Sequence, residues 1–120
     1  VSEHDKRHEL ARGYLTAADP AKEREVAAAL RHILEAFMRV ACPEHFPPGQ
    51  LLGPFIGQCE QRLGTNNQIL DANDITELRA LLAYANQFHH DTNPAWQTAA
   101  INDAELTDFT ERTLLFASRR

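Results

Sequence analysis

The amino-acid sequence predicts an all-α fold, a helical bundle of four to five helices, from three observations. Apolar residues recur at the three- and four-residue spacing of amphipathic helices, and no window alternates apolar and polar residues as a half-buried strand does. The five Gly and six Pro residues are few and clustered, so long segments run uninterrupted between them. With 120 residues, 43% of them hydrophobic and 24% charged, the chain has the size and composition of one globular domain.

The first helix is predicted over residues 3–16. It is charged along most of its surface, and Leu10, Tyr14 and Leu15 form its apolar side. We see no strong N-cap before residue 3 and expect this helix to fray at its start or to continue from a preceding domain.

The second helix, over residues 20–41, has the clearest pattern. Asp19 is a suitable N-cap, and Pro20 fits the first helical position because its missing N–H would be unpaired there anyway. The apolar stripe contains Val26, Leu30, Ile33, Phe37 and Ala41, widened by Ala27, Leu34 and Met38. We place Phe37 at its centre. The helix ends at Cys42, because the residue before a proline disfavours the α conformation.

Three further helices follow a rigid, proline-rich loop at 43–49. The third is predicted over 50–63 and stops at Gly64, since glycine readily adopts the left-handed conformation beyond a helix end. The fourth is predicted over 74–90, opening at Asp74. The fifth is predicted over 103–119, with Asn102 or Asp103 as its cap.

Charge and cysteine content restrict the partners and the compartment. The 17 acidic residues outnumber the 12 basic ones, and the net charge of −5 gives no electrostatic reason to bind nucleic acid or an anionic membrane. Two cysteines, Cys42 and Cys59, cannot build a disulfide scaffold and fit a reducing compartment. The sequence has neither an apolar stretch of membrane-spanning length nor a signal peptide, so we expect a cytoplasmic protein without a membrane partner.

The first residue is Val1 rather than methionine. We therefore expect residues 1–120 to be a single helical domain that is a fragment of a larger protein. Such a fragment need not carry the activity of the whole.

The most distinctive polar string follows Tyr84 and contains Asn86 and His90. If the fourth helix runs through it, these two residues share one helical face, four positions apart. One interpretation is a helix C-terminus whose polar side chains hold the next loop. Another is catalysis, with His90 as general acid or base and Asn86 as its positioning partner. A third is a binding role.

Metal and cofactor chemistry has little support in the sequence. Cys42 and His45 have a Cys-x2-His spacing, and Cys59 and the His89/His90 pair are other possible donors, but a zinc site needs four placed ligands. We expect Cys59 to be a buried structural thiol. No nucleotide-binding glycine loop, HExxH or GxSxG string occurs. We expect no metal and no cofactor.

Arg31 and Glu35 lie one turn apart on the second helix. They fit a solvated surface pair, but the neighbouring apolar Leu34 brings Glu35 to the border of the buried face. Because buried polar groups on facing helices must satisfy one another, we predict that the second and fourth helices pack side by side. Glu35 or Arg31 would then reach Asn86 or His90.

Five strings carry a family resemblance: Arg31-His32-Ile33-Leu34-Glu35-Ala36-Phe37-Met38-Arg39, Cys42-Pro43, Leu51-Leu52-Gly53-Pro54-Phe55-Ile56, Asn86-Gln87-Phe88-His89-His90 and Ile101-Asn102-Asp103-Ala104-Glu105-Leu106. Over about residues 24–117 the chain resembles the C-terminal region of bacterial AAA/ABC-type ATPases akin to SMC and Rad50 proteins. This group includes relatives of anticodon nucleases and of phage-defence proteins. In it, a helix of the type R-x-x-LE-x-F is followed by a helix ending N-x-F-S/H-H.

The chain also resembles HEPN domains, which are all-α bundles of toxins, antitoxins and defence ATPases. Their nucleases have Arg, a polar residue and, a few positions later, His. Asn86 and His90 match the last two, but Ala85 stands where the Arg is expected. Without that guanidinium nothing nearby in sequence stabilises the charge developing on a scissile phosphate, which argues against ribonuclease activity.

Two functions follow from these resemblances. The first is a non-catalytic interaction or dimerisation module at the C-terminus of a larger bacterial ATPase, with a second copy or the parent protein's domains as partner. The alternative is a HEPN-type ribonuclease using His90, for which nucleic acid is the partner despite the acidic charge. Only the second needs a cation near His90, supplied by Arg31, Arg79 or a dimer mate.

Overall fold

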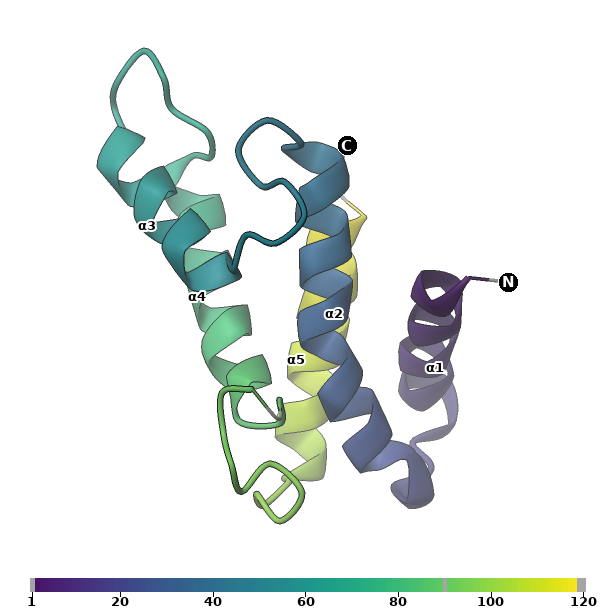
Figure 1. Cartoon of the computed structure of the whole chain (residues 1–120). Coiled ribbons are helices and arrows are strands. Elements are labelled where there is room, and N and C mark those ends of the chain that lie inside the picture. The colour runs from purple at the N-terminus through teal and green to yellow at the C-terminus, as the bar shows by residue number, and fades with distance from the viewer. Residues whose placement is uncertain (1, 90, 119–120) are drawn as a thin grey trace.

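Residues 2–89 and 91–118 are described by a computed structural model, and within them the chain forms five α-helices and no strand (Figure 1). The helices are α1 (Glu3–Ala17), α2 (Glu23–Ala41), α3 (Leu52–Arg62), α4 (Ala72–Asn86) and α5 (Asp103–Ala117), and a 3-10 turn, η1 (Pro20–Lys22), leads into α2. The predicted all-α bundle is confirmed. Over the same residues, each helix is too short or too polar to cross a membrane.

Helix α2 lies at the centre of the bundle. It packs against α1, α4 and α5, and α3 packs against α4. Figure 1 shows α2 and α5 running side by side in the same direction, with α1 on one side and the α3–α4 pair on the other. The C-terminal ends of α2, α3 and α5 therefore lie at the same end of the molecule as the start of α4.

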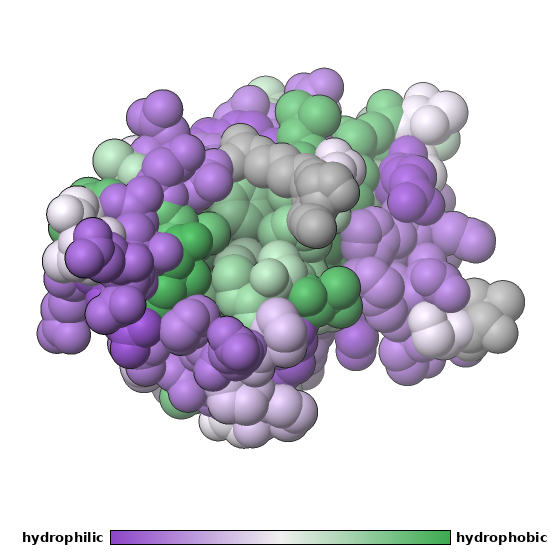
Figure 2. All heavy atoms as spheres, turned by 90° about the horizontal axis from the view of Figure 1, so that it is seen from above, coloured by the Kyte–Doolittle hydropathy of each residue, from purple (hydrophilic) through white to green (hydrophobic). Residues whose placement is uncertain are grey.

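Large apolar side chains are exposed at this end. Val40 in the last turn of α2 is 81% exposed, Leu115 in the last turn of α5 is 61% exposed, and Leu63, directly after α3, is 42% exposed. Ile69, just before α4, lines a surface groove with the start of the α2–α3 loop. Figure 2 looks onto this end and shows an apolar hollow with polar residues along much of its rim. We call this end of the bundle, which carries Val40, Leu63, Ile69 and Leu115, the apolar end.

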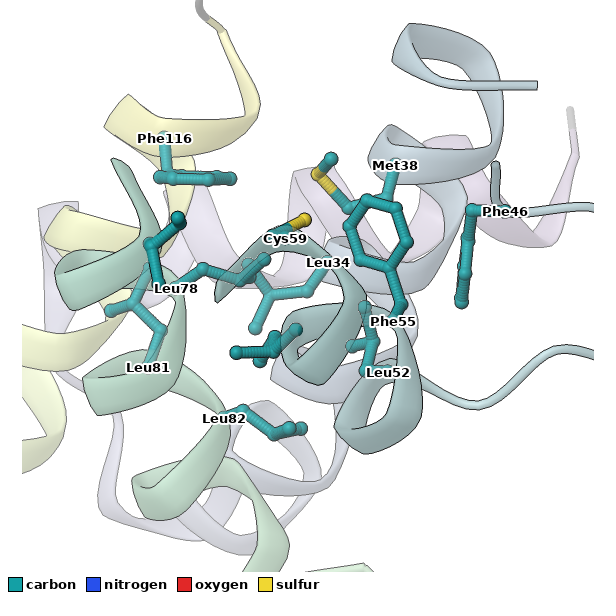
Figure 3. Packing of buried hydrophobic residues seen from close by; sticks show 12 residues of the cluster. Leu34, Met38, Phe46, Leu52, Phe55, Cys59, Leu78, Leu81, Leu82 and Phe116 are labelled. Atoms are coloured by element: carbon teal, nitrogen blue, oxygen red, sulfur yellow. The ribbon is translucent and has the colours of Figure 1, made fainter. Parts of the chain in front are cut away.

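Two groups of buried residues form the core, and α2 contributes to both. One joins α2 to α3, α4 and the last turn of α5 (Figure 3), and it consists of Leu34, Met38, Phe46, Leu52, Phe55, Ile56, Cys59, Ile75, Leu78, Leu81, Leu82 and Phe116. The other joins α1 and α2 to the end of α4 and the start of α5, and it consists of Tyr14, Val26, Ala27, Leu30, Tyr84, Ala85, Phe88 and Leu106. These contacts fix the position of α4 on α2, and that position determines the site described below.

The predicted place of Phe37 is wrong. Leu34 and Met38 are fully buried at the centre of the α2 face, whereas Phe37 is only half-buried beside them. Its ring makes an edge contact with Phe116, with centroids 5.8 Å apart. The periodicity gave the right stripe, but Phe37 lies at its edge, toward the last turn of α5.

Side-chain caps start four of the helical segments. Ser2 accepts a hydrogen bond from the N–H of Asp5, so α1 has the cap that the sequence analysis missed. The Asp19 cap is confirmed, although the turn that it opens is 3-10 helix. Asp71 caps α4, three residues before the predicted start at Asp74, and Asn102, one of the two predicted candidates, caps α5.

The third helix is shorter than predicted. It spans Leu52–Arg62 rather than 50–63. Beyond it, Gly64 has a φ of +79°, the left-handed conformation expected of glycine after a helix.

Candidate functional site

Arg31 connects the second and fourth helices through a buried polar cluster. Its Nη1 donates a hydrogen bond of 2.6 Å to Oδ1 of Asn86, at the last residue of α4. Its Nε donates one of 3.3 Å to Oε2 of Glu35, one turn along α2. This confirms the prediction that the two helices pack together and bring Arg31 or Glu35 to Asn86 or His90, and it shows that Arg31 and Asn86 make the contact. We call Arg31, Glu35 and Asn86 the Arg31 cluster.

The cluster is largely shielded from solvent. The side chains of Arg31 and Glu35 are only 7% and 14% exposed. A buried guanidinium needs such partners, because an unpaired charge inside a protein is strongly destabilising. Arg31 thus binds groups of its own chain, and in this arrangement it holds α4 on α2 rather than presenting a cation to a substrate.

Two histidines lie beside this cluster. The rings of His32 and His89 have centroids 5.3 Å apart, and His32 Nδ1 is 3.9 Å from Oε1 of Glu35. His89 is buried, and its Nδ1 accepts a hydrogen bond of 3.3 Å from the N–H of Asp91. From the sequence, His89 was expected only as a possible metal donor, and its place against α2 was not predicted. The position of His89 directly after the buried Phe88 could have indicated this place, but only if the end of α4 is set at Asn86.

The predicted end of the fourth helix is wrong, and with it the helical relation between Asn86 and His90. The helix stops at Asn86, and the following N–H groups make tighter three-residue turns, such as Phe88 to the carbonyl of Ala85. The Thr92 hydroxyl donates to the Asn86 carbonyl at 2.7 Å, and Asn93 Nδ2 donates to the Gln87 carbonyl at 2.9 Å. These bonds replace the next helical turn. They confirm that polar side chains hold the loop after α4.

His90, the predicted general acid or base, lies outside the described residues. Of the cations considered for it, Arg31 is the one next to Asn86. Arg79 instead forms an ion pair with Glu60 across α3 and α4, with Nη2 to Oε2 at 2.8 Å.

Cys59 is a buried free thiol. Burial raises the pKa of Cys59 to about 11, so its thiolate, the nucleophilic form, is scarce at neutral pH. In the part of the chain that the structure describes, no group of three or more His, Cys, Asp or Glu side chains is arranged to hold a metal ion.

No family model, no curated protein and no solved structure matches this chain. The resemblance to ATPase and HEPN sequences remains a prediction from the motifs.

The stability of the domain is expected to fall as the pH drops below about 6.5, partly because of His32. Burial lowers the pKa of His32, with Arg7, His89 and Arg31 acting in the same direction and Glu35 opposing them. Because the folded-state pKa lies below the unfolded one, the unfolded chain takes up the proton first. The loss of stability therefore begins as the pH falls to the pKa that His32 has in the unfolded chain. It levels off below the pKa that His32 has in the folded chain.

Urea unfolding between about pH 8 and pH 5 measures this effect. A His32→Gln variant should show a shallower fall in unfolding free energy than the parent, whereas His45→Gln, in the α2–α3 loop, should follow the parent. Equal slopes for His32→Gln and the parent would contradict the prediction.

Proposed function

We propose that this domain is a non-catalytic interaction and dimerisation module at the C-terminus of a larger bacterial ATPase of the SMC- and Rad50-like group. The motif strings support this parentage. The two most distinctive strings lie on α2 and at the end of α4, and the hydrogen bond between Arg31 and Asn86 joins them. They therefore act as one structural unit, whose polar residues hold the bundle together. Its cellular setting would be a nucleic-acid or phage-defence system.

The observation that carries the interaction function is the apolar end. Val40 and Leu115 expose most of their surface in the last turns of two neighbouring helices, and the hollow in Figure 2 lies at this end. Single exposed apolar residues are ordinary, but a hollow apolar surface with a polar rim is typical of a protein-binding site. A second copy of the domain is the simplest occupant, because two-fold dimers are the commonest closed assemblies.

Light scattering at micromolar concentration tests dimerisation through the apolar end. The parent is expected to have the mass of a dimer, and a Val40→Glu, Leu115→Glu variant the mass of a monomer, since both substitutions place charge in an apolar contact. Leu51→Glu is the matched control, because Leu51 is 57% exposed but lies before α3, away from the apolar end. Circular dichroism checks that the helices are retained.

A monomeric parent would rule out dimerisation and leave docking to the parent protein's other domains. If Leu51→Glu dissociated the dimer and the double variant did not, the contact would lie elsewhere.

One observation favours the alternative, a HEPN-type ribonuclease. The HEPN motif has an arginine where this chain has Ala85, and in the structure the guanidinium of Arg31 lies next to Asn86 instead. For catalysis, the cluster would have to open so that Arg31 could reach a phosphate, and His90 would carry the proton.

An RNA cleavage assay decides between the two. The non-catalytic proposal expects no cleavage above background. Cleavage that His90→Ala abolishes with the fold intact would overturn it, whereas equal cleavage by the parent and His90→Ala would exclude the His90 mechanism.

A further inference from the structure

Two histidines on α1 form a separate cluster, remote from the Arg31 cluster in sequence and function. His4 and His8 lie one helical turn apart, with ring centroids 4.4 Å apart and ring planes inclined by 69°. Nδ1 of His4 and Nε2 of His8 are both shielded from solvent without a hydrogen-bond partner in the described residues. A shielded nitrogen without a partner is unfavourable, and each instance calls for an explanation.

We propose that His4 and His8 together chelate a divalent transition-metal ion of the class that prefers imidazole, with Ni²⁺ and Cu²⁺ favoured over Zn²⁺. Histidines at positions i and i+4 of a helix lie on one face, so both rings reach the same ion without a change of backbone. Imidazole in its neutral form is a suitable ligand for all three metals.

The distance between the rings indicates which geometry the pair fits. If one nitrogen of each ring binds a metal at about 2.0–2.1 Å with a right angle at the metal, the ring centroids lie about 4.5 Å apart. A tetrahedral angle would separate them to about 5 Å. The observed 4.4 Å is nearer to the right-angle value, so the two rings can share one ion without moving apart. Right angles between neighbouring ligands belong to the square-planar and octahedral sites of Cu²⁺ and Ni²⁺, whereas Zn²⁺ prefers a tetrahedron.

The surroundings of the pair suit a cation with an incomplete protein ligand set. Asp5, Glu9 and Arg12 line the same surface hollow as the two histidines. Two carboxylates against one guanidinium leave a local excess of negative charge. Because the described residues provide no cluster of three candidate ligands, the remaining positions on the metal belong to water. The site is thus a two-histidine chelate on the surface, open to exchange, rather than a closed structural centre.

Titration of Ni²⁺ into the whole chain by isothermal calorimetry tests the proposal. The amino terminus is acetylated for this experiment, so that the terminal amine adds no ligand. We expect one binding event, weakened more than about tenfold by His4→Gln and by His8→Gln, because each variant leaves a single imidazole. His45→Gln, which removes a histidine from the α2–α3 loop, should bind Ni²⁺ like the parent.

Thermal unfolding provides a second readout. An ion that needs both rings on one helical face binds the folded chain in preference to the unfolded one, so Ni²⁺ should raise the melting temperature of the parent but not of His8→Gln. The proposal is wrong if either single variant keeps the parent's affinity, if His45→Gln weakens binding as much as His8→Gln, or if the acetylated parent does not bind. Circular dichroism without metal confirms that the variants keep their helices.

Discussion

Replacing Phe55 by alanine is expected to lower the free energy of unfolding by about 3–5 kcal/mol. Phe55 is fully buried in α3, and its ring packs at 5.1 Å from that of Phe46, which the α2–α3 loop brings into the core. Truncation removes these contacts and leaves a cavity that the close-packed neighbours fill only in part. A domain of this size is stable by about 5–15 kcal/mol in total, so the variant should lose a large share of its stability. Urea denaturation followed by circular dichroism measures the loss.

Two comparison variants make this result specific. Phe37→Ala should be milder than Phe55→Ala, because Phe37 is only half-buried and lies at the edge of the α2 face. Phe55→Leu should also be milder, because leucine keeps most of the apolar volume. If Phe37→Ala were the more damaging change, the core would be centred on Phe37, as the periodicity alone indicated.

The helix starts show how far local sequence rules reach in this chain. Asp19 was predicted as a cap and is one, and of the two neighbouring residues considered for α5, Asn102 and Asp103, Asn102 is the cap. At α4 two aspartates compete three residues apart. Asp71 accepts from the N–H of Asp74 at 2.8 Å, so Asp74 occupies the first turn, where its charge also complements the helix dipole. Neither residue between them breaks a helix, so the earlier cap starts it.

The helix end after Asn86 could not be predicted from periodicity. Apolar spacing continues through Phe88, which is buried although it lies beyond the helix. The end is fixed instead by Thr92 and Asn93, whose side chains bind the carbonyls of Asn86 and Gln87. Such bonds depend on how a loop folds back, and spacing in the sequence does not reveal that. The error matters for function, because it removes the shared helical face on which the pairing of Asn86 with His90 rested.

The contact between Arg31 and Asn86 could be predicted because it depends on the pairing of buried polar groups. It does not depend on where each helix begins and ends. A polar residue bordering the apolar stripe of α2 requires a partner on a facing helix, and α4 carries one. What the sequence left open was whether Glu35 or Arg31 makes the contact. The longer Arg31 side chain does so, and Glu35 holds the other side of the guanidinium.

Replacing Arg31 by methionine is therefore expected to lower the free energy of unfolding by about 3–5 kcal/mol, a loss comparable to that of Phe55→Ala. Methionine fills much of the volume, so the loss comes from the polar partners. Glu35 would be left with its charge at 14% exposure, and Oδ1 of Asn86 would lose its 2.6 Å hydrogen bond. Arg31→Lys should fall between the parent and Arg31→Met, because an ammonium keeps the charge but cannot bind both partners with a fixed planar group. Urea unfolding at pH 7 compares the three proteins.

A compensating variant separates the loss of partners from the loss of packing. Replacing Arg31 by methionine together with Glu35→Leu and Asn86→Leu removes every polar group of the cluster at once. Apolar replacement of a whole buried ion pair is often neutral or stabilising, so this triple variant should recover most of the stability that Arg31→Met loses. If Arg31→Met alone were as stable as the parent, Arg31 would not be the tie between α2 and α4. If the triple variant were less stable than Arg31→Met, the three side chains would not act as one buried network, and the structural role on which the non-catalytic proposal rests would lose its support.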